Sequence, residues 1–442
     1  MISADIIIIG AGPAGLETAS QALRQGKDVV IIERSQLGGT CLNLGCIPSK
    51  ALYASSQTAE AVKSAAEMGV EIAGTPVPSY AKAALRKDSV VESLRQGVAA
   101  SLQKAHVVEG EAKLLPDMTV EAAGETYTAP QIVIATGSEP SRLPIPGAEL
   151  ALTSDDVLKP GWTAPADIVI IGGGVIGMEI ACILNSFGTQ VTVVEYAPEI
   201  LPSFDREIAK RLRSLLQRKG IKIAVGAAAT EIRQGMEVDY TCKGKTQTVK
   251  AGAVLMAVGR RPVCPVGLSE CGIALEGRAI RTDDSFATSA AGIYAVGDVN
   301  GRLMLAHAAE AQAAMMMGHD GIRLDTVPAD AFTSPECAMV GLTEEQCAAS
   351  GLRIKTAKSL FRANGKACAM GETDGFVKVI AEQETGRLLG CHIIGPHASD
   401  LIQEAAQAIA SGQTAADVAD TIHAHPTLSE VVMQAMRAVA AD

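Results

Sequence analysis

The chain has 442 residues, of which 48% are hydrophobic and 43 are glycines, so it is long enough for two to four domains and is not an intrinsically disordered protein. Its formal net charge of −11 argues against nucleic acid or an anionic membrane as the main partner, although a basic protein partner is compatible with it. The many glycines and the 3% aromatic content are typical of an α/β protein with tight turns and an aliphatic core.

The first apolar run, residues 6–9, predicts a buried strand. It is far too short to cross a membrane and has no basic flank, so it is not a signal peptide. We therefore expect no membrane partner and a cytoplasmic protein.

A dinucleotide fingerprint surrounds that strand. The strand runs into Gly10, Gly12 and Gly15, a helix is predicted through residue 23, and a second strand from residue 28 ends at Glu33. Such glycines allow a tight turn close to a pyrophosphate, the helix N-terminus favours its charge, and the acid accepts hydrogen bonds from ribose hydroxyls. The pattern predicts a nucleotide site.

The next stretch, residues 38–50, reads GGTCLNLGCIPSK and contains Cys41 and Cys46. Residues five apart in a regular helix lie too far apart for a disulfide, so a bond between them needs a break in the helix, which we expect at Gly45. Lys50 would then lie one turn after Cys46 and favour its thiolate.

The two thiols have three other interpretations: a structural staple, a metal site and two unrelated thiols. The stretch has no His and no third Cys, so we expect no metal. Cytosolic disulfides are mostly catalytic or redox-sensing, which favours a dithiol that opens and closes. The other eight cysteines are predicted to be ordinary small hydrophobic residues.

The fingerprint returns later in the chain. Each of its four key residues lies 162 positions after its counterpart in the first unit: Gly172 follows Gly10, Gly174 follows Gly12, Gly177 follows Gly15, and Glu195 follows Glu33. This repeat predicts two nucleotide sites. The alternative interpretation is one nucleotide site and one unrelated turn. Glu195 suits a free 2′-hydroxyl, and the next three residues offer no Arg or Lys for a 2′-phosphate, so NAD is favoured over NADP. The position of the first site before the dithiol suggests a flavin there.

Further strands are predicted at 252–258, ending at Gly259, and at 292–296, ending before Asp298. Asp298 is available to a polar cofactor tail or is a solvated turn residue. After residue 328 the pattern changes: strands at 376–381 and 388–394 alternate around Gly386, and 398–410 is an amphipathic helix. This part is predicted to be a separate α+β domain.

The C-terminal motif HAHPTLSE spans residues 423–430. Thr427 and Glu430 form the pattern of a capping box for the last helix, which would account for both structurally. Alternatively, Glu430 orients His425 as a catalytic base. The sequence leaves both interpretations open. Five other histidines show no ligand spacing and are predicted to have surface or packing roles: His106, His307, His319, His392 and His397.

Together these motifs resemble the flavoprotein disulfide reductase family over essentially the whole chain. The dithiol stretch, FTSPECAMVG at 332–341 and HAHPTLSE are similar to the members that oxidise dihydrolipoamide. The resemblance implies an α/β fold with two Rossmann-like FAD- and NAD-binding domains and a C-terminal α+β dimerisation domain. The implied segments are 1–148 for FAD, 149–265 for NAD, 266–327 for the second part of the FAD or central domain, and 328–442 for dimerisation.

The resemblance also implies the site. FAD would be bound by Gly10, Gly12, Gly15, Glu33, Lys50 and Asp298, NAD by Gly172, Gly174, Gly177 and Glu195, and Thr136, Gly137 and Gly259 would also lie at the cofactors. Glu179 would pair with Lys50, although an acid in a first helical turn has a structural explanation as well. In the implied homodimer, His425 faces Cys41 and Cys46 of the other subunit, and the peptide before Pro426 is cis.

The implied activity is oxidation of protein-bound dihydrolipoamide through the dithiol and FAD to NAD. The implied partners are the lipoyl domains and core subunits of 2-oxoacid dehydrogenase or glycine cleavage complexes. The implied catalytic residues are Cys41, Cys46, His425, Glu430, Lys50 and Glu179. One rival is a mercuric reductase-like enzyme, which the lack of any cysteine after Cys391 disfavours. The other is a non-catalytic FAD scaffold, which the intact set of catalytic residues disfavours.

Overall fold

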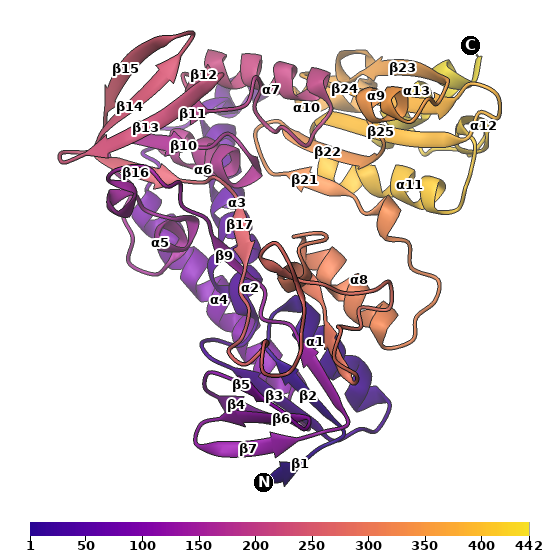
Figure 1. Ribbon diagram of the computed structural model, residues 1–442. Coiled ribbons are helices and arrows are strands. Elements are labelled where there is room, and N and C mark those ends of the chain that lie inside the picture. The colour runs from indigo at the N-terminus through magenta and orange to yellow at the C-terminus, as the bar shows by residue number, and fades with distance from the viewer. Residues whose placement is uncertain (442) are drawn as a thin grey trace.

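The computed structural model describes residues 1–441. The first nucleotide unit is centred on a parallel sheet (Figure 1). The strand order is β20-β8-β2-β3-β4, and every neighbouring pair is parallel. The strands are β2 (Ile6–Ile9), β3 (Val29–Glu33), β4 (His106–Glu109), β8 (Gln131–Ile134) and β20 (Ile293–Ala295). The predicted first strand and the strand ending at Glu33 are confirmed.

The four consecutive isoleucines of β2 are all buried because both faces of this sheet are covered. Side chains of one parity, such as Ile6 and Ile8, pack against α1 (Pro13–Arg24) and α8 (Ala306–Met316). Those of the other parity, Ile7 and Ile9, pack against a small second sheet of order β1-β7-β6-β5. That sheet consists of β1 (Ile2–Ser3), β5 (Lys113–Leu115), β6 (Thr119–Ala122) and β7 (Glu125–Thr128).

The second nucleotide unit repeats this architecture. Its parallel sheet has the order β12-β11-β10-β16, with α6 and α7 on one face and the antiparallel meander β13-β14-β15 on the other. The strands are β10 (Asp167–Ile171), β11 (Gln190–Glu195), β12 (Lys222–Val225), β13 (Ala227–Arg233), β14 (Glu237–Cys242), β15 (Lys245–Lys250) and β16 (Ala253–Met256), and the helices are α6 (Val175–Ser186) and α7 (Arg206–Arg218).

The chain after residue 328 forms the predicted α+β unit. Five antiparallel strands in the order β21-β22-β25-β24-β23 pack against α11 and α13. The strands are β21 (Ala329–Ala331), β22 (Glu336–Gly341), β23 (Ile354–Leu360), β24 (Phe376–Glu382) and β25 (Leu388–Gly395), and the helices are α9 (Glu344–Ala349), α10 (Gly365–Met370), α11 (Ala398–Ala410), α12 (Ala415–Ala419) and α13 (Ser429–Ala441). The predicted hairpin around Gly386 and the predicted helix 398–410 are confirmed.

The remaining elements connect these units. Helices α2 (Gly39–Leu44), α3 (Cys46–Lys63) and α4 (Tyr80–Ser101) run from the first unit to the second, and β9 (Ser138–Pro140) pairs with β17 (Arg260–Pro262). The short elements are α5 (Ser154–Leu158), β18 (Leu275–Glu276), β19 (Ala279–Ile280), η1 (Ala65–Met68), η2 (Ala148–Leu150), η3 (Gly297–Asn300), η4 (Leu324–Thr326) and η5 (Phe361–Ala363). The segment bounds at 148, 265 and 327 stay predictions.

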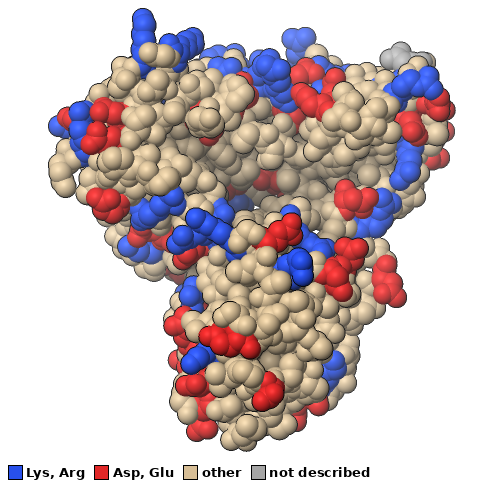
Figure 2. All heavy atoms as spheres, viewed as in Figure 1, with Lys and Arg blue, Asp and Glu red and all other residues tan. Residues whose placement is uncertain are grey.

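A buried ion pair joins the second nucleotide unit to the C-terminal unit. Lys378 on β24 is 2% exposed, and its Nζ lies 2.8 Å from Asp205 at the N-cap of α7 and 3.0 Å from Glu207. On the visible face, acidic and basic side chains are intermixed, so the excess negative charge is not gathered in one patch there (Figure 2).

Candidate active site

The first glycine fingerprint forms the tight turn that its sequence predicts. Gly10 has φ +104°, and a Cβ on it would lie 2.4 Å from the carbonyl oxygen of Ala135. A Cβ on Gly15 would lie 1.9 Å from the oxygen of Gly10. Neither position has room for a side chain, so both glycines are required by the turn itself.

The second fingerprint has the same geometry. Gly172 has φ +109° and a would-be Cβ 2.3 Å from the oxygen of Ala257, and the Cβ of Gly177 would lie 2.1 Å from the oxygen of Gly172. The two units therefore share a backbone conformation as well as a spacing. The alternative of one nucleotide turn and one unrelated turn is not what the structure shows.

The acid of each fingerprint accepts two backbone N–H groups. Glu33 accepts from Ala11 and Ser35, both at 2.8 Å. Glu195 accepts from Gly173 and, at 2.5 Å, from Ala197. Each carboxylate oxygen has a second lone pair, so both acids fix the glycine loop and keep acceptor capacity for a ribose hydroxyl.

Helices α1 and α6 both begin in a way that suits a phosphate. Their N-cap residues are Gly12 and Gly174, neither helix has a side-chain cap, and neither has an acid in its first turn. A Cβ on Gly174 would meet nothing within 4 Å, so open space lies before that helix. The first N–H groups of both helices are thus left for an anion, and the residues fit the pyrophosphate of a dinucleotide.

Asp298, Thr136, Gly137 and Gly259 lie where the two nucleotide units meet. The Ser138 hydroxyl donates to Asp298 at 2.5 Å, and burial raises the pKa of this carboxyl. Asp298 is therefore not the solvated turn residue of the alternative interpretation. The Thr136 hydroxyl donates to the oxygen of Val263 at 2.5 Å, Gly137 accepts from the N–H of Val263, and Gly259 accepts from the N–H of Ser141.

The dithiol stretch is a helix broken at one residue, as predicted. Gly45 has φ −139° and ψ −111°, and it separates α2 from α3 between the two cysteines. A Cβ there would lie 2.9 Å from the oxygen of Thr40. The break brings Cys41 and Cys46 together, and in this structure both are free thiols.

The two thiols have different acidities. A hydrogen bond from Cys41 lowers the pKa of Cys46 to about 7; burial opposes this shift, and the charge of Lys50 adds to it. The same hydrogen bond, together with burial, raises the pKa of Cys41 above its ordinary range. Cys46 is therefore the residue that carries a thiolate near neutral pH.

Lys50 is held by two partners from elsewhere in the chain. Its Nζ lies 3.0 Å from each carboxylate oxygen of Glu179 on α6, and it lies 4.4 Å from the ring centre of Phe332. The N–H of Phe332 donates to Glu179 at 3.0 Å. The pairing of Lys50 with Glu179 is confirmed, whereas the part played by Phe332 was not predicted.

Glu430 serves both interpretations that the sequence left open. One oxygen lies 3.0 Å from Nδ1 of His425, and the other accepts from the N–H of Thr427 at 2.9 Å. These two contacts, that with Thr427 first, lower the pKa of Glu430. The predicted capping box is wrong in one half, because the Thr427 hydroxyl contacts Ala424 and Ser429 instead, and α13 begins only at Ser429.

His425 faces solvent in the single chain. Its side chain is 78% exposed, and among the described residues no hydrogen bond joins it to either cysteine. The peptide before Pro426 is cis, as predicted, and a second cis peptide precedes Pro335. The structure thus brings together Cys41, Cys46, Lys50 and Glu179 as one group and His425 with Glu430 as another.

A second His–Glu pair stands beside the first and was missed by the sequence analysis. Nε2 of His423 lies 2.7 Å from Glu404 on α11, its Nδ1 lies 2.8 Å from the oxygen of Thr421, and its side chain is 6% exposed. Glu404 is 19 residues earlier, on α11, so no local spacing in the sequence links it to His423.

The other eight cysteines were predicted to be ordinary small hydrophobic residues. Cys182, Cys337, Cys347 and Cys391 are buried, which fits this prediction, whereas Cys368 is exposed, which does not. Within residues 1–441 no three His, Cys, Asp or Glu side chains form a group able to hold a metal ion, and no helix there has the length and apolarity that crossing a membrane requires.

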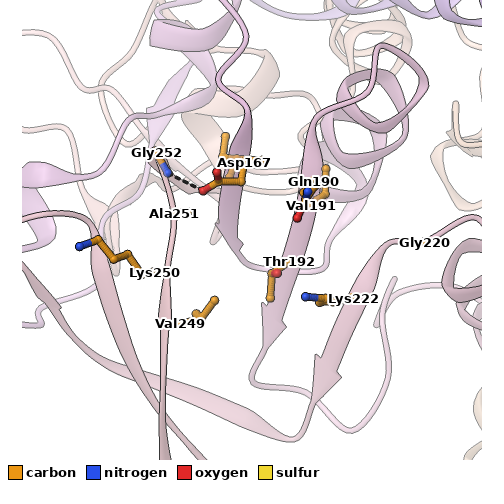
Figure 3. Close-up of a pocket in the computed structure, with 11 residues that line it drawn as sticks. Asp167, Gln190, Val191, Thr192, Gly220, Lys222, Val249, Lys250, Ala251 and Gly252 are labelled. Atoms are coloured by element: carbon orange, nitrogen blue, oxygen red, sulfur yellow. Dashed lines mark hydrogen bonds between the residues drawn. The ribbon is translucent and has the colours of Figure 1, made fainter.

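A cavity of about 690 Å³ lies at the opposite edge of the second sheet from Glu195 (Figure 3). It is lined at the starts of β10, β11 and β12 by residues such as Asp167, Gln190 and Lys222, and the Asp167 carboxylate accepts from the N–H of Gly252 at 2.7 Å. Nucleotides bind at the carboxyl ends of parallel strands, so this cavity is not the nucleotide site.

Comparison with known families matches almost the whole chain. A model of the pyridine nucleotide-disulphide oxidoreductase family matches residues 4–313, and the dimerisation domain model of that family matches residues 327–436. The chain is also similar to a solved structure, the Cu(II) complex of the HOCl-induced flavoprotein disulfide reductase RclA from Escherichia coli. The two share 28% identity and a TM-score of 0.88, over 99% of this chain and 100% of that one.

Curated relatives are similar over nearly their full length. A dihydrolipoyl dehydrogenase of Geobacillus stearothermophilus is 40% identical over 451 residues, which is 98% of this chain and 96% of the relative. One of Bacillus subtilis is 39% identical over 469 residues, covering 99% and 98%, and one of Thermus scotoductus is 37% identical over 449 residues, covering 98% and 97%.

Proposed function

The chain belongs to the pyridine nucleotide-disulphide oxidoreductase family, and on that premise we propose that it works as a dihydrolipoyl dehydrogenase. It oxidises dihydrolipoamide to lipoamide and reduces NAD. The observation that carries this proposal is the helix break at Gly45, which brings Cys41 and Cys46 together beside Lys50 and lowers the pKa of Cys46 to about 7.

The cofactors of this family are FAD and NAD. The first unit suits FAD through the free N-terminus of α1, Glu33 and Asp298, and the second suits NAD through the N-terminus of α6 and Glu195. When bound, FAD would supply a two-electron carrier between the dithiol and NAD.

The protein side chains carry out the thiol chemistry of the oxidised enzyme. His425 removes a proton from one thiol of dihydrolipoamide, and the thiolate attacks Sγ of Cys41 in a Cys41–Cys46 disulfide. The S–S bond breaks, Cys46 leaves as a thiolate, and a mixed disulfide forms on Cys41. The second substrate thiol then attacks the substrate sulfur of the mixed disulfide, which closes the lipoamide ring and releases Cys41. The proton of this second thiol passes to Cys41, and His425 keeps the first proton until it is released to solvent.

Two contacts prepare these residues for their steps. Glu430 holds Nδ1 of His425, so Nε2 is left to accept the substrate proton. The ammonium of Lys50 stabilises Cys46 as it leaves, and Glu179 keeps that ammonium in place.

The protein forms a homodimer through its dimerisation domain. We propose that His425 of each subunit acts on the dithiol of the other. The support is that His425 is 78% exposed in the single chain and has no hydrogen bond to either cysteine among the described residues. The proposed substrate carriers are lipoyl domains of 2-oxoacid dehydrogenase or glycine cleavage complexes, and the cytoplasmic location stays a prediction.

Replacing His425 tests the proposed activity and the role of His425 as its general base. His425→Gln should slow dihydrolipoamide oxidation by about 10²- to 10⁴-fold, the usual contribution of a general base, while reduction of bound FAD by NADH is unchanged. Full dihydrolipoamide activity in this variant would contradict the role of His425. Activity with a mercuric or other disulfide substrate, and none with dihydrolipoamide, would favour the mercuric reductase-like alternative.

Subunit mixing tests the site across the dimer. Cys41→Ser and His425→Gln are each expected to be inactive, but a mixed dimer of the two has one site with both native residues. Dissociation and reassociation of the two variants together should therefore restore activity. No recovery, with mixed dimers shown to form, would place His425 and the dithiol in the same subunit.

A further inference from the structure

We propose that His423 and Glu404 form a clamp that positions His425, so that one His–Glu pair carries out proton transfer and the other places the base. His423 and Glu404 are positioning residues, because they act through His425. The proposal rests on the proposed function, in which His425 is the general base, and it gives a role to a pair that the proposed mechanism does not use.

The segment that carries His425 has little support of its own. Residues 421–428 lie between α12 and α13 and form neither helix nor strand. Within residues 1–441, the backbone N–H groups of residues 422–425 donate no hydrogen bond to another part of the chain. In the single chain Ile422 is 96% exposed and the His425 side chain is 78% exposed, so neither packs the segment against the domain. A segment with so few contacts needs an anchored side chain to hold its position.

His423 supplies that anchor. Its Nε2 lies 2.7 Å from Glu404 on α11, its Nδ1 lies 2.8 Å from the oxygen of Thr421, and its side chain is 6% exposed. Ile402 and Ala405, on either side of Glu404 along α11, are fully buried, and α11 packs against β22 and β25. The clamp therefore ties the segment to a rigid element of the domain core.

The two histidines differ in what their ring nitrogens contact. In His423 both nitrogens face acceptors, a carbonyl oxygen and a carboxylate, so neither is left to accept a proton from a substrate. In His425 only Nδ1 has a partner, which is Glu430 at 3.0 Å. His423 is therefore suited to hold the segment and His425 to act as the base.

The two His–Glu pairs hold the base from two sides. Glu430 lies on α13, after His425, and fixes the orientation of its imidazole. The clamp lies before His425 and fixes the backbone two residues away. A displacement of about 1 Å at a reacting group can lower a rate by about 100-fold. A base that acts on the dithiol of the other subunit thus depends on where its own subunit presents it.

Glu404→Leu tests the clamp and leaves both histidines and Glu430 in place. We expect kcat for dihydrolipoamide oxidation to fall by about 10- to 100-fold, with KM changed by less than about twofold. NADH oxidation with an artificial acceptor does not use His425 and should be unchanged. Glu404→Gln keeps an acceptor oxygen for Nε2 of His423, so it should retain at least about a third of the native kcat.

His423→Phe is a second variant, which keeps the test usable if Glu404→Leu folds poorly. It keeps a ring but removes both nitrogens, so it should lower kcat as much as Glu404→Leu does. The double variant should lose no more than either single one, because the two residues act as a unit. Asp400→Asn is the matched control: it disrupts another His–acid pair of α11, 3.5 Å from His397, but both side chains are exposed and kcat should not change.

Hydrogen exchange gives a readout that does not use dihydrolipoamide. The N–H of Thr427 donates to Glu430, and that of Val431 donates to the oxygen of Leu428. Both lie in a peptide covering residues 424–431, whose exchange can be followed by mass spectrometry in the FAD-containing protein. We expect faster exchange in Glu404→Leu, because the segment before these bonds is released, and native exchange in Glu404→Gln.

Native kcat in both Glu404→Leu and His423→Phe would overturn the proposal. Equal loss of both activities in these variants would also overturn it, because a purely structural role lowers them together, and so would unchanged exchange. If the native protein did not oxidise dihydrolipoamide, the proposed function would fall, and the exchange comparison would still decide whether the clamp holds the segment. An active native protein whose clamp variants keep native kcat and exchange would overturn the clamp alone.

Discussion

Replacing Lys50 should raise the pKa of Cys46 and slow its reactions near neutral pH. Lys50 lies four residues after Cys46 on α3, where side-chain origins are about 5–6 Å apart. Two unit charges at about 6 Å interact by about 3 kcal/mol at an effective dielectric constant of about 20. The Lys50 side chain is 33% exposed, so we halve this value for solvent screening.

The remaining interaction of about 1.4 kcal/mol corresponds to about one pKa unit. For Lys50→Met we therefore expect the midpoint of Cys46 alkylation to move from about 7 to about 8. Glu179 acts in the opposite direction, because its charge raises the pKa of Cys46. Glu179→Gln should move the midpoint to lower pH, and the two variants thus bracket the native protein.

The assay is the pH dependence of Cys46 alkylation in the dithiol-reduced protein, followed at the Cys46 peptide. Lys63→Met is the matched control, because Lys63 is on the same helix, is 54% exposed and pairs with Glu60. If Lys50→Met and Glu179→Gln both superimpose on the native profile, the reasoning is refuted. The hydrogen bond from Cys41 would then set the thiolate alone.

Three further predictions have defined outcomes. Glu430→Ala should lower the rate of dihydrolipoamide oxidation by about 10- to 100-fold, because His425 loses its partner, while NADH oxidation with an artificial acceptor should be unchanged; equal loss of both activities would contradict this role. Lys378→Met should lower the free energy of unfolding by about 3 kcal/mol in urea, since it leaves the buried Asp205 without its cation, whereas the exposed Lys358→Met should change it by less than about 0.5 kcal/mol. Burial raises the pKa of Asp205, but the hydrogen bond from Lys378 outweighs it and lowers this pKa below 3.8. The ion pair therefore stabilises the fold fully above that pH, and this stabilisation is lost as the pH falls through the pKa of Asp205 in the folded state. If acid lowered the free energy of unfolding equally in the native protein and in Lys378→Met, this assignment would be refuted.

Much of the nucleotide-binding architecture could be predicted because local sequence determines it. Gly10 and Gly172 need a positive φ and have no room for a side chain, and this constraint appears in the sequence as a repeated glycine pattern. Gly45 was likewise predictable, because two cysteines five apart cannot join within a regular helix. The α+β unit followed from alternating strands and one amphipathic helix.

The missed features all depend on contacts between distant parts of the chain. The N–H of Phe332 reaches Glu179 across 153 residues. His423 pairs with Glu404 through the packing of the C-terminal loop on α11. The half-formed capping box has a local cause, since the Thr427 hydroxyl finds a carbonyl three residues back.

The central claim is that electrons pass from dihydrolipoamide through Cys41 and Cys46 to NAD. The most direct measurement is NADH formation by the purified FAD-containing protein, supplied with dihydrolipoamide and NAD, compared with a Cys46→Ser variant. We predict one NADH for each dihydrolipoamide oxidised by the native protein and none from the variant. A native protein whose FAD is reduced by NADH but which forms no NADH from dihydrolipoamide would contradict the claim, as would full activity in Cys46→Ser.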